Sequence, residues 1–400
     1  MEYFFILWYI LRAAILVLLA LTSFTTLIVT LRRLPSGKQL TTGYRVLLSL
    51  GGAAALTIIG AWLLNELATR PAPRRQLQPS PYHPALLFQS ESAVRTLTFS
   101  PDDARLAAGF AGPPREAVND STIRVWDMTT RQALWSVGTQ GVVDSLAFLP
   151  DGMTIATNTM GSFDVLLWDT TSGHHTGTLA REMEPGRSGI LQVAVSPNGR
   201  WLAAAEYFSV AIWDMADSAL LTVLPQEASD GGLEFSPDGA ILAVAHSGQV
   251  TMWETSGWTQ ASTLAASQAV RDMAFSGDSR YLATGSSQDE TATVWDLRTG
   301  EPLFTAECKC RYVRSVALSP DGSLLVLGHF LGNLSVWTVL TGELIAVDST
   351  TPEMIMDVAF NHAGDLFATG SIDGAIRLWD PAAFTNGLAG DPTAAPSMIP

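Results

Sequence analysis

The sequence predicts an all-β fold, a seven-bladed β-propeller with velcro closure, preceded by a two-helix transmembrane hairpin. Velcro closure means that a strand from the start of the propeller completes its last blade. Three observations predict this fold: a tryptophan that recurs seven times, a turn motif that recurs in phase with it, and two uncharged apolar segments ahead of both. With 47% hydrophobic and 15% charged residues, the chain is too apolar for a purely soluble protein and too polar for one of many spans.

Residues 1–64 are predicted to form two transmembrane helices, at about 13–31 and 46–64, because each stretch holds nineteen residues without a charge. That length just spans a hydrocarbon core of about 30 Å. A cleavable signal peptide fits less well, because two spans follow each other without a small-residue cleavage pattern. The flanking Lys and Arg residues favour a cytoplasmic hairpin loop and a propeller outside the cytoplasm. Arg-rich, Lys-poor usage suggests a bacterial source and hence a bacterial cell membrane. The proline-rich residues 65–83 are predicted to be an extended linker.

The repeat is carried by tryptophans that follow one or two apolar residues, at successive spacings of 42, 45, 40, 42, 42 and 42 residues. They are Trp126, Trp168, Trp213, Trp253, Trp295, Trp337 and Trp379. A period of about 40 to 45 residues is that of a four-stranded propeller blade. About two-thirds of a repeat earlier, an alternating apolar run ends in a turn such as LEFSPDG or VALSPDG, where Gly239 and Gly322 suit a left-handed position. Two markers in phase through seven copies predict seven blades over residues 84–381.

The closure of the ring is predicted from the two ends of the repeat region. No outer strand is apparent after Trp379, where residues 382–400 are predicted to be a flexible tail. The apolar run Ala85–Gln89 stands before the first complete copy and is placed to serve as that missing strand. Such pairing removes the open edges of an unclosed sheet.

The repeats resemble the WD-repeat family from Pro84 to Asp380. Five of the seven tryptophans are followed by an aspartate: Asp127, Asp169, Asp214, Asp296 and Asp380. The resemblance implies a closed propeller of four-stranded blades that binds partners on one face. The Gly-His pair that the family carries before each inner strand is absent. Asp120, Asp289 and Asp373 stand six residues before their tryptophans, where the family has its turn aspartate, and without the histidine they are expected only to cap the turn locally.

Charge is divided unevenly, since residues 1–85 carry eight Lys and Arg against two acids (net +6) and the rest fifteen against thirty-six (net −21). A domain this acidic would repel a phosphate backbone, which argues against a nucleic-acid partner. The two cysteines, Cys308 and Cys310, exclude a disulfide framework. No phosphate loop, nucleotide fingerprint, zinc quartet or nucleophile elbow occurs in the sequence, so no catalytic, cofactor or metal site is predicted.

A partner-binding site is predicted where the inner strands begin. Aligning the repeats places one residue of each blade there: Arg95, Asp144, Leu191, Gly231, Arg271, Arg314 and Met356. Three arginines beside apolar Leu and Met suit an acidic or amphipathic peptide, because Arg binds carboxylates bidentately and is enriched at interface hot spots. The alternative is that these arginines only neutralise acids such as Asp144 and Asp272.

The function predicted from these features is that of a non-enzymatic, membrane-anchored scaffold that binds a protein or peptide on the propeller face and in its central channel. One alternative is a hydrolase or lyase that uses Asp272 and Asp357, which occupy equivalent positions on the inner strands of the fifth and seventh blades. The other is a membrane-bound ligand sensor, against which stands the lack of an output domain beyond the hairpin loop.

Overall fold

The computed structural model describes Tyr82 and residues 84–112, 121–139, 141–181, 189–226, 228, 232–246, 248–266, 269–288, 290–307 and 312–385. Both predicted membrane spans and, apart from Tyr82, the predicted linker lie outside these residues. So do Asp120, Gly231, Asp289, Cys308 and Cys310. In the described part of the chain, no helix has the length and apolar character needed to cross a bilayer.

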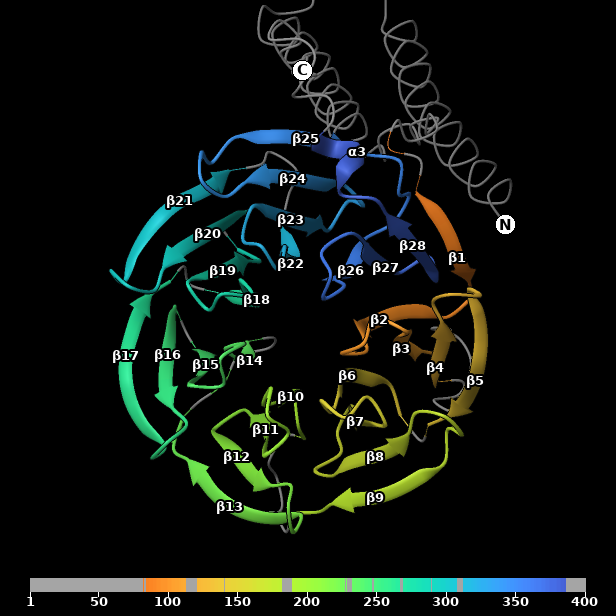
Figure 1. Cartoon of the computed structure of the whole chain (residues 1–400), viewed down its shortest axis with the longest axis vertical. Helices are drawn as coiled ribbons and strands as arrows, with labels where there is room; N and C mark the ends of the chain where they lie inside the picture. Colours follow the sequence, from red (N-terminus) through yellow and green to blue (C-terminus); the bar gives the residue numbers. More distant parts are fainter. Residues whose placement is uncertain are drawn as a thin grey trace, which may run out of the picture. The chain divides into compact units, whose positions relative to one another are not determined.

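The described strands form seven four-stranded antiparallel sheets that are arranged as blades around an axis, which confirms the predicted propeller (Figure 1). The inner strands are β2 (Ala93–Phe99), β6 (Val143–Phe148), β10 (Gln192–Val195), β14 (Leu233–Phe235), β18 (Val270–Phe275), β22 (Val313–Leu318) and β26 (Ile355–Phe360). The second strands are β3 (Arg105–Ala111), β7 (Thr154–Thr159), β11 (Trp201–Glu206), β15 (Ile241–His246), β19 (Tyr281–Ser286), β23 (Leu324–His329) and β27 (Phe367–Ser371).

Each blade is completed by a third strand and an outer strand. The third strands are β4 (Thr122–Asp127), β8 (Val165–Asp169), β12 (Ser209–Asp214), β16 (Gln249–Glu254), β20 (Thr291–Asp296), β24 (Leu334–Thr338) and β28 (Ala375–Trp379). The outer strands are β5 (Gln132–Gly138), β9 (His175–Leu179), β13 (Ala219–Leu224), β17 (Thr259–Ala265), β21 (Glu301–Glu307), β25 (Leu344–Asp348) and β1 (Ala85–Gln89). Blades are numbered one to seven in the order of their inner strands.

The position of a strand within its blade follows from its residue pattern. The second strands are covered by sheets on both sides, and β11 is accordingly the continuous run WLAAAE, of which every residue is buried. Outer strands face solvent, and β17, with the sequence TQASTLA, buries only Leu264. Apolar content therefore falls from the axis to the rim of the ring.

All seven repeat tryptophans are buried at the end of the third strands, and the most exposed of them, Trp253, is only 9% exposed. In blades one to six, the pairing of third and outer strands shifts register directly before the tryptophan, as between Val125 and Trp126. Such a bulge turns the large indole into the space between neighbouring blades. There it joins apolar clusters drawn from two blades, such as the one that contains Ile123, Phe148 and Trp168.

The ring is closed as predicted, because β1 pairs with β28 from Ala85 opposite Leu378 to Gln89 opposite Ala375. Beyond β28, the first residues of the predicted tail form a short helix, α3 (Ala382–Thr385). Phe384 is 4% exposed and stacks on Tyr82, with 4.2 Å between ring centroids. The prediction of a flexible tail from residue 382 overlooked this contact, since one aromatic residue after Trp379 has no repeat partner to mark it.

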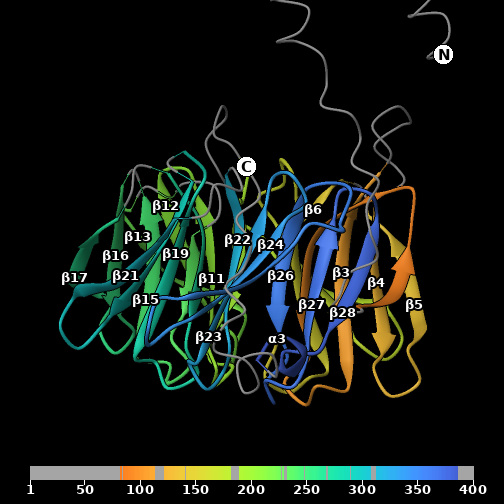
Figure 2. The same ribbon diagram turned by 90° about the horizontal axis from the view of Figure 1, so that it is seen from above.

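The predicted hairpin turns are present between inner and second strands. Gly239 and Gly322 have φ values of 72° and 69°, and Ser236 Oγ donates to Asp238 Oδ1 at 2.6 Å. We call the face that carries these turns the turn side. The opposite face, where loops enter the inner strands and join second to third strands, is the loop side. Strands of all blades run between the two faces, and α3 lies at one of them (Figure 2).

Candidate functional site

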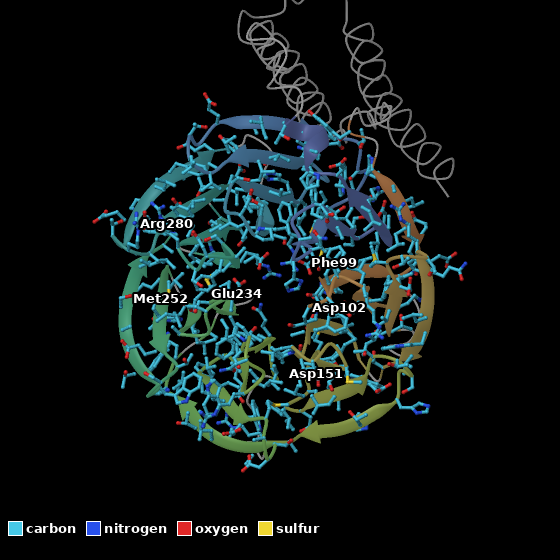
Figure 3. All side chains as sticks on the ribbon, in the orientation of Figure 1. Phe99, Asp102, Asp151, Glu234, Met252 and Arg280 are labelled. Atoms are coloured by element: carbon cyan, nitrogen blue, oxygen red, sulfur yellow. The ribbon has the colours of Figure 1, made fainter. Side chains whose placement is uncertain are left out.

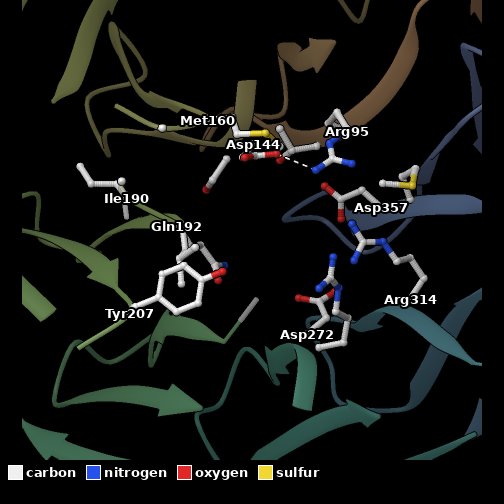
Figure 4. A pocket seen from close by; sticks show the side chains of 16 residues that line it. Arg95, Asp144, Met160, Ile190, Gln192, Tyr207, Asp272, Arg314 and Asp357 are labelled. Carbon is white, nitrogen blue, oxygen red and sulfur yellow. Dashed lines mark hydrogen bonds and ion pairs between the residues drawn. The ribbon is translucent and has the colours of Figure 1, made fainter. Parts of the chain in front are cut away.

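The loop-side end of the axis holds a cavity of about 560 Å³, and all six of the predicted site residues that are described line it. They are Arg95, Asp144, Leu191, Arg271, Arg314 and Met356. Each of these residues directly precedes a polar residue of its inner strand, and together those polar residues form a layer around the axis. Because the blade repeats, residues some 40 positions apart in the sequence meet at one mouth. Figure 4 shows Arg95 and Arg314 projecting into this space beside Asp272 and Asp357.

The arginines of the mouth differ in their partners. Arg95 Nη2 donates to Asp144 Oδ1 of the next blade at 2.7 Å, so the alternative reading, neutralisation of a nearby acid, holds for this residue. Arg314 is different, because its Nε is buried and has no hydrogen-bond partner within the described residues. A buried donor without an acceptor costs about 1–3 kcal/mol, which an anionic ligand would relieve.

The layer beneath the mouth joins neighbouring blades through side chains that accept main-chain hydrogen bonds. Asp272 Oδ2 accepts from Val316 N at 2.9 Å, and Asp357 Oδ2 accepts from Leu97 N at 2.7 Å. Ser315 lies between them and donates to Asp272 Oδ2 at 2.7 Å and is 3.2 Å from Asp357 Oδ1. The two carboxyl groups therefore share one hydroxyl and each anchors the inner strand of the following blade.

The same layer continues around the ring with uncharged residues. Ser145 Oγ accepts from Val193 N at 3.2 Å, and Gln192 Oε1 accepts from Leu233 N at 3.1 Å. This recurrence shows that Asp272 and Asp357 occupy structural positions that Ser and Gln also fill elsewhere. Their carboxylates are committed to main-chain N–H groups, which leaves little capacity for general acid–base work.

Blade four breaks the pattern because Gly232 stands in the layer, where a Cβ atom would collide with Ala245. Two residues further along the axis, Glu234 receives a hydrogen bond from the main chain of Phe275 in the next blade. Its Oε2 is buried without a hydrogen-bond partner in the described part of the chain. Sequence reasoning missed Glu234, although an acid in an inner strand where five other blades carry Ala was a visible signal.

Burial is the main influence on the pKa values of these acids. It raises the pKa of Glu234 to about 8, with a smaller contribution from the charge of Asp272. Burial also raises the pKa of Asp272 and of Asp357, and the charge of Asp357 raises that of Asp272 further. Hydrogen bonds to the carboxylates oppose the shift without cancelling it. Protons are therefore retained in this layer at a pH where surface acids have lost theirs.

Exposed apolar side chains surround the loop-side mouth. Tyr207 and Phe208 lie on the loop between β11 and β12, with 6.4 Å between ring centroids. Tyr312 and Phe330, 41% and 45% exposed, meet edge to face at 6.0 Å on the loops before β22 and after β23. Met160 of blade two is 57% exposed and also lines the cavity. Aromatic and apolar side chains thus remain exposed beside the arginines of the mouth.

A buried ion pair at the base of the loop that carries Tyr207 and Phe208 holds this loop in place. Arg181 Nη1 donates to Glu206 Oε1 at 2.6 Å, and Ser209 Oγ donates to Glu206 Oε2 at 2.6 Å. Glu206 is 2% exposed, so both of its oxygens are satisfied by neighbours and not by water. The loop segments 112–120 and 181–188 of this face are described only at their ends, Gly112 and Arg181.

The repeat residues have structural partners that the sequence did not reveal. The indole N–H groups of Trp168, Trp295 and Trp379 donate to threonines of the second strands, which are Thr157, Thr284 and Thr369, at 2.9, 3.0 and 2.9 Å. Blade six uses Ser335, which accepts from Trp337 at 3.0 Å and lies 2.8 Å from the buried His329.

Asp373 acts as a local turn cap, as expected. It accepts hydrogen bonds from Ser371 Oγ and from Ala375 N. The sequence did not reveal its ion pair with Arg377, whose Nη2 lies 3.1 Å from Asp373 Oδ2.

Four stretches of the chain match the family model described as WD domain, G-beta repeat: residues 84–127, 177–214, 258–296 and 342–380. Each stretch ends on a Trp-Asp pair and runs from an outer strand through three strands of the next blade. This offset explains the closure, because the first matched stretch begins with β1, the outer strand of blade seven.

The chain is also similar to ribosomal proteins. It is 32% identical over 143 residues to the small ribosomal subunit protein RACK1 of Caenorhabditis elegans, which covers 35% of this chain and 39% of the relative. It is 32% identical over 111 residues to the small ribosomal subunit protein RACK1y of Oryza sativa subsp. japonica, covering 27% of this chain and 31% of the relative. The matches thus span less than two-fifths of the length of either relative.

These comparisons correct one prediction and confirm another. The predicted location in a bacterial cell membrane, with the propeller outside the cytoplasm, is wrong, because the relatives are proteins of the small ribosomal subunit. The prediction rested on the hydropathy of residues 1–64, which measures only how a segment partitions into an apolar phase. The resemblance of the repeats is confirmed by the family model. Four stretches of this seven-bladed propeller are thus similar to WD40 repeats.

Proposed function

We propose that this chain is a non-enzymatic scaffold whose loop-side mouth binds an acidic or amphipathic segment of a partner protein. The observation that carries the proposal is the convergence of Arg95, Arg271 and Arg314 on one cavity, beside Leu191 and Met356. Arg314 adds a buried Nε that has no acceptor within the described residues. A carboxylate entering the mouth would supply that acceptor through a charge-assisted hydrogen bond.

The rim determines what surrounds the acidic group of the ligand. Tyr207 lines the mouth, and Phe208, Tyr312 and Phe330 offer further exposed aromatic surface on loops of the same face. Aromatic residues around a central arginine are typical of interface hot spots. The expected segment therefore carries an acidic residue flanked by apolar ones. WD40 repeats and relatives that are components of a larger assembly both favour a protein partner.

Hydrolase or lyase chemistry at Asp272 and Asp357 receives less support from the geometry, because both carboxylates hold the main chain of adjacent blades. An alanine at either position would leave a buried N–H without an acceptor and would confuse loss of fold with loss of activity. Asn is the better replacement, since its carbonyl oxygen still accepts. An enzyme should lose its activity with Asp272→Asn and Asp357→Asn while its fold is retained.

The test compares partners captured by the full chain and by a triple variant, Arg95→Ala, Arg271→Ala and Arg314→Ala. A matched control replaces three exposed turn-side arginines, Arg131, Arg200 and Arg298, by Ala. We expect the first variant to lose the captured set and the control to retain it, with both showing the same circular dichroism spectrum as the parent. If the loop-side variant captures the same proteins as the parent, the site lies elsewhere and the proposal fails.

A further inference from the structure

The turn-side half of the axis holds a second cavity, of about 850 Å³, lined by apolar residues such as Phe235 and Pro237 and by polar ones such as Ser196, Asn361 and His362. It shares Thr96, Ser145, Gln192, Asp272 and Asp357 with the loop-side cavity, so the two follow one another along the axis. One layer further toward the turn side, the equivalent position of the inner strand is Ala in five blades: Ala147, Ala194, Ala274, Ala317 and Ala359. The remaining two residues of this Ala layer are Thr98 and Glu234.

Charge in this cavity is uncompensated. The ionisable residues that line it are Glu234, Asp272, Asp357 and His362, and no Lys or Arg is found among its described lining. Arg95, Arg271 and Arg314 line the other cavity. The carboxyl groups of Asp272 and Asp357 are occupied by main-chain N–H groups and Ser315.

Glu234 is the acid that has capacity left for a ligand. Its Oε2 is buried and has no hydrogen-bond partner in the described residues, and Figure 3 shows the residue at the inner margin of the ring. A buried acceptor of this kind is costly unless a donor reaches it. Glu234 and the small side chains of the Ala layer line the same cavity.

The route to Glu234 determines the shape of a ligand. Pro101, Pro150, Pro197, Pro237 and Pro320 line the turn-side mouth, and buried aromatic side chains such as Phe235 and Phe275 lie between them and the Ala layer. From Pro237 to Glu234 the chain advances three residues, roughly 10 Å at about 3.3 Å per residue. A donor must therefore be carried on a slim apolar stem of about that length.

We propose that the turn-side cavity binds an ammonium group on a slim apolar stem, which donates a hydrogen bond to Glu234 and neutralises it. The shared chemistry is that of a free alkylammonium ion and of a lysine side chain presented by a partner. This site shares a polar layer with the loop-side cavity but is centred on Glu234, which does not line that cavity.

Proton release distinguishes this site from simple apolar binding. Burial raises the pKa of Glu234 to about 8, and the neighbouring Asp272 adds to the shift. An ammonium ion stabilises the ionised carboxylate, so binding near neutral pH must displace the proton. Affinity then rises with pH through about 8 and falls only when the ammonium group, with an ordinary pKa of about 10.4, loses its own proton. Asp272, Asp357 and the exposed His362 are the other ionisable groups that face the cavity.

The experiment is calorimetric titration of the full chain with n-hexylammonium chloride and, as a neutral probe of the same shape, 1-hexanol. At pH 8.5 we expect hexylammonium to bind at least about tenfold more tightly than hexanol. At pH 7, titrations in buffers of different ionisation enthalpy should show release of up to one proton. The third probe is Nα-acetyl-lysine N-methylamide. Tighter binding of this probe than of hexylammonium assigns the site to a partner's lysine, and weaker binding assigns it to a free amine.

Three variants make the result specific. Glu234→Gln keeps the shape of the side chain and should weaken hexylammonium about tenfold while leaving hexanol unchanged. Ala274→Leu narrows the Ala layer and should weaken both probes. The exposed Glu254 belongs to the same blade, and Glu254→Gln should change neither. The proposal is overturned if hexylammonium does not bind, if hexanol binds as tightly, or if Glu234→Gln leaves hexylammonium affinity unchanged. None of these results bears on the loop-side arginines.

Discussion

At the scale of single residues, the seven repeat tryptophans are equivalent in burial but not in hydrogen bonding. Trp295 donates its indole N–H to Thr284, whereas the Nε1 of Trp253 is buried without an acceptor in the described residues. The corresponding residue of blade four, Val244, offers no hydroxyl group. An unsatisfied buried donor costs about 1–3 kcal/mol. The same indole is thus stabilising in one blade and partly destabilising in the next.

This difference predicts the outcome of one substitution made at two positions. Trp295→Phe should lower the free energy of unfolding by more than Trp253→Phe, by about 1 kcal/mol or more, because only Trp295 loses a hydrogen bond. Both changes remove a similar apolar volume, so each serves as the control for the other. Urea unfolding of the full chain measures the difference. Equal losses would show that the hydrogen bond of Trp295 contributes nothing net.

At the scale of elements, several contacts besides strand pairing hold the closing strand in blade seven and join that blade to blade one. Gln89 Nε2 donates to Asp373 O at 2.6 Å on the loop side. On the turn side, Asp103 accepts from the main-chain N–H groups of His362 and Ala363, both at 2.8 Å. Leu97 N and Asp357 add a bond near the axis. The joint made by the two ends of the propeller is thus secured at both faces and in its interior.

Deletion of residues 84–90 should therefore broaden the unfolding transition and lower its midpoint, since blade seven loses its outer strand while the contacts of Asp103 remain. Point variants of β1 resolve the cause. Phe88 packs on Phe110 and Trp126, with centroids at 5.8 and 5.3 Å, and Phe88→Ala should cost about 2 kcal/mol or more. Leu86 is 59% exposed, and Leu86→Ala should cost less than about 0.5 kcal/mol. Thermal unfolding, monitored by tryptophan fluorescence, measures these losses of stability. A deletion protein that melts as sharply and as high as the parent contradicts closure by β1.

At the scale of the whole molecule, charge is sorted along the axis of an acidic propeller. Three arginines and three aspartates line the loop-side mouth, whereas no Lys or Arg is found among the described residues that line the turn-side cavity. Surface acids behave differently from the axial ones. A hydrogen bond from Arg298, for example, lowers the pKa of Asp296 to about 2, so this group is fully ionised by pH 5. Between pH 5 and 8 the axial acids change charge, because burial raises the pKa values of Glu234, Asp272 and Asp357.

The pH dependence of stability follows from the direction of these shifts. The folded pKa of Glu234 is raised from 4.5 to about 8, so its stabilising contribution is complete below pH 4.5 and is lost as pH rises through about 8. Asp272 and Asp357 act in the same direction. We expect the free energy of unfolding to fall between pH 5 and 8, by up to about 1.4 kcal/mol per pH unit for each proton involved.

Glu234→Gln should flatten this decline, and the exposed Glu254→Gln should not, as measured by urea unfolding at a series of pH values. Parallel curves for the parent and Glu234→Gln would mean that Glu234 has an ordinary pKa.

The sequence by itself determined the repeat, the number of blades, the closing strand and the set of residues at the loop-side mouth. All of these depend on local patterns or on counting equivalent positions through a periodic chain, as with Arg95, Arg271 and Arg314. Tertiary structure decided which of these residues have partners. Arg95 meets Asp144, and Leu97 meets Asp357, across joints between blades that separate them by 49 and 260 positions. Glu234 likewise became a candidate site only when neighbouring blades buried one oxygen and left it without a donor. Periodicity specifies where a side chain points, whereas its pKa and hydrogen bonds depend on what the next blade places against it.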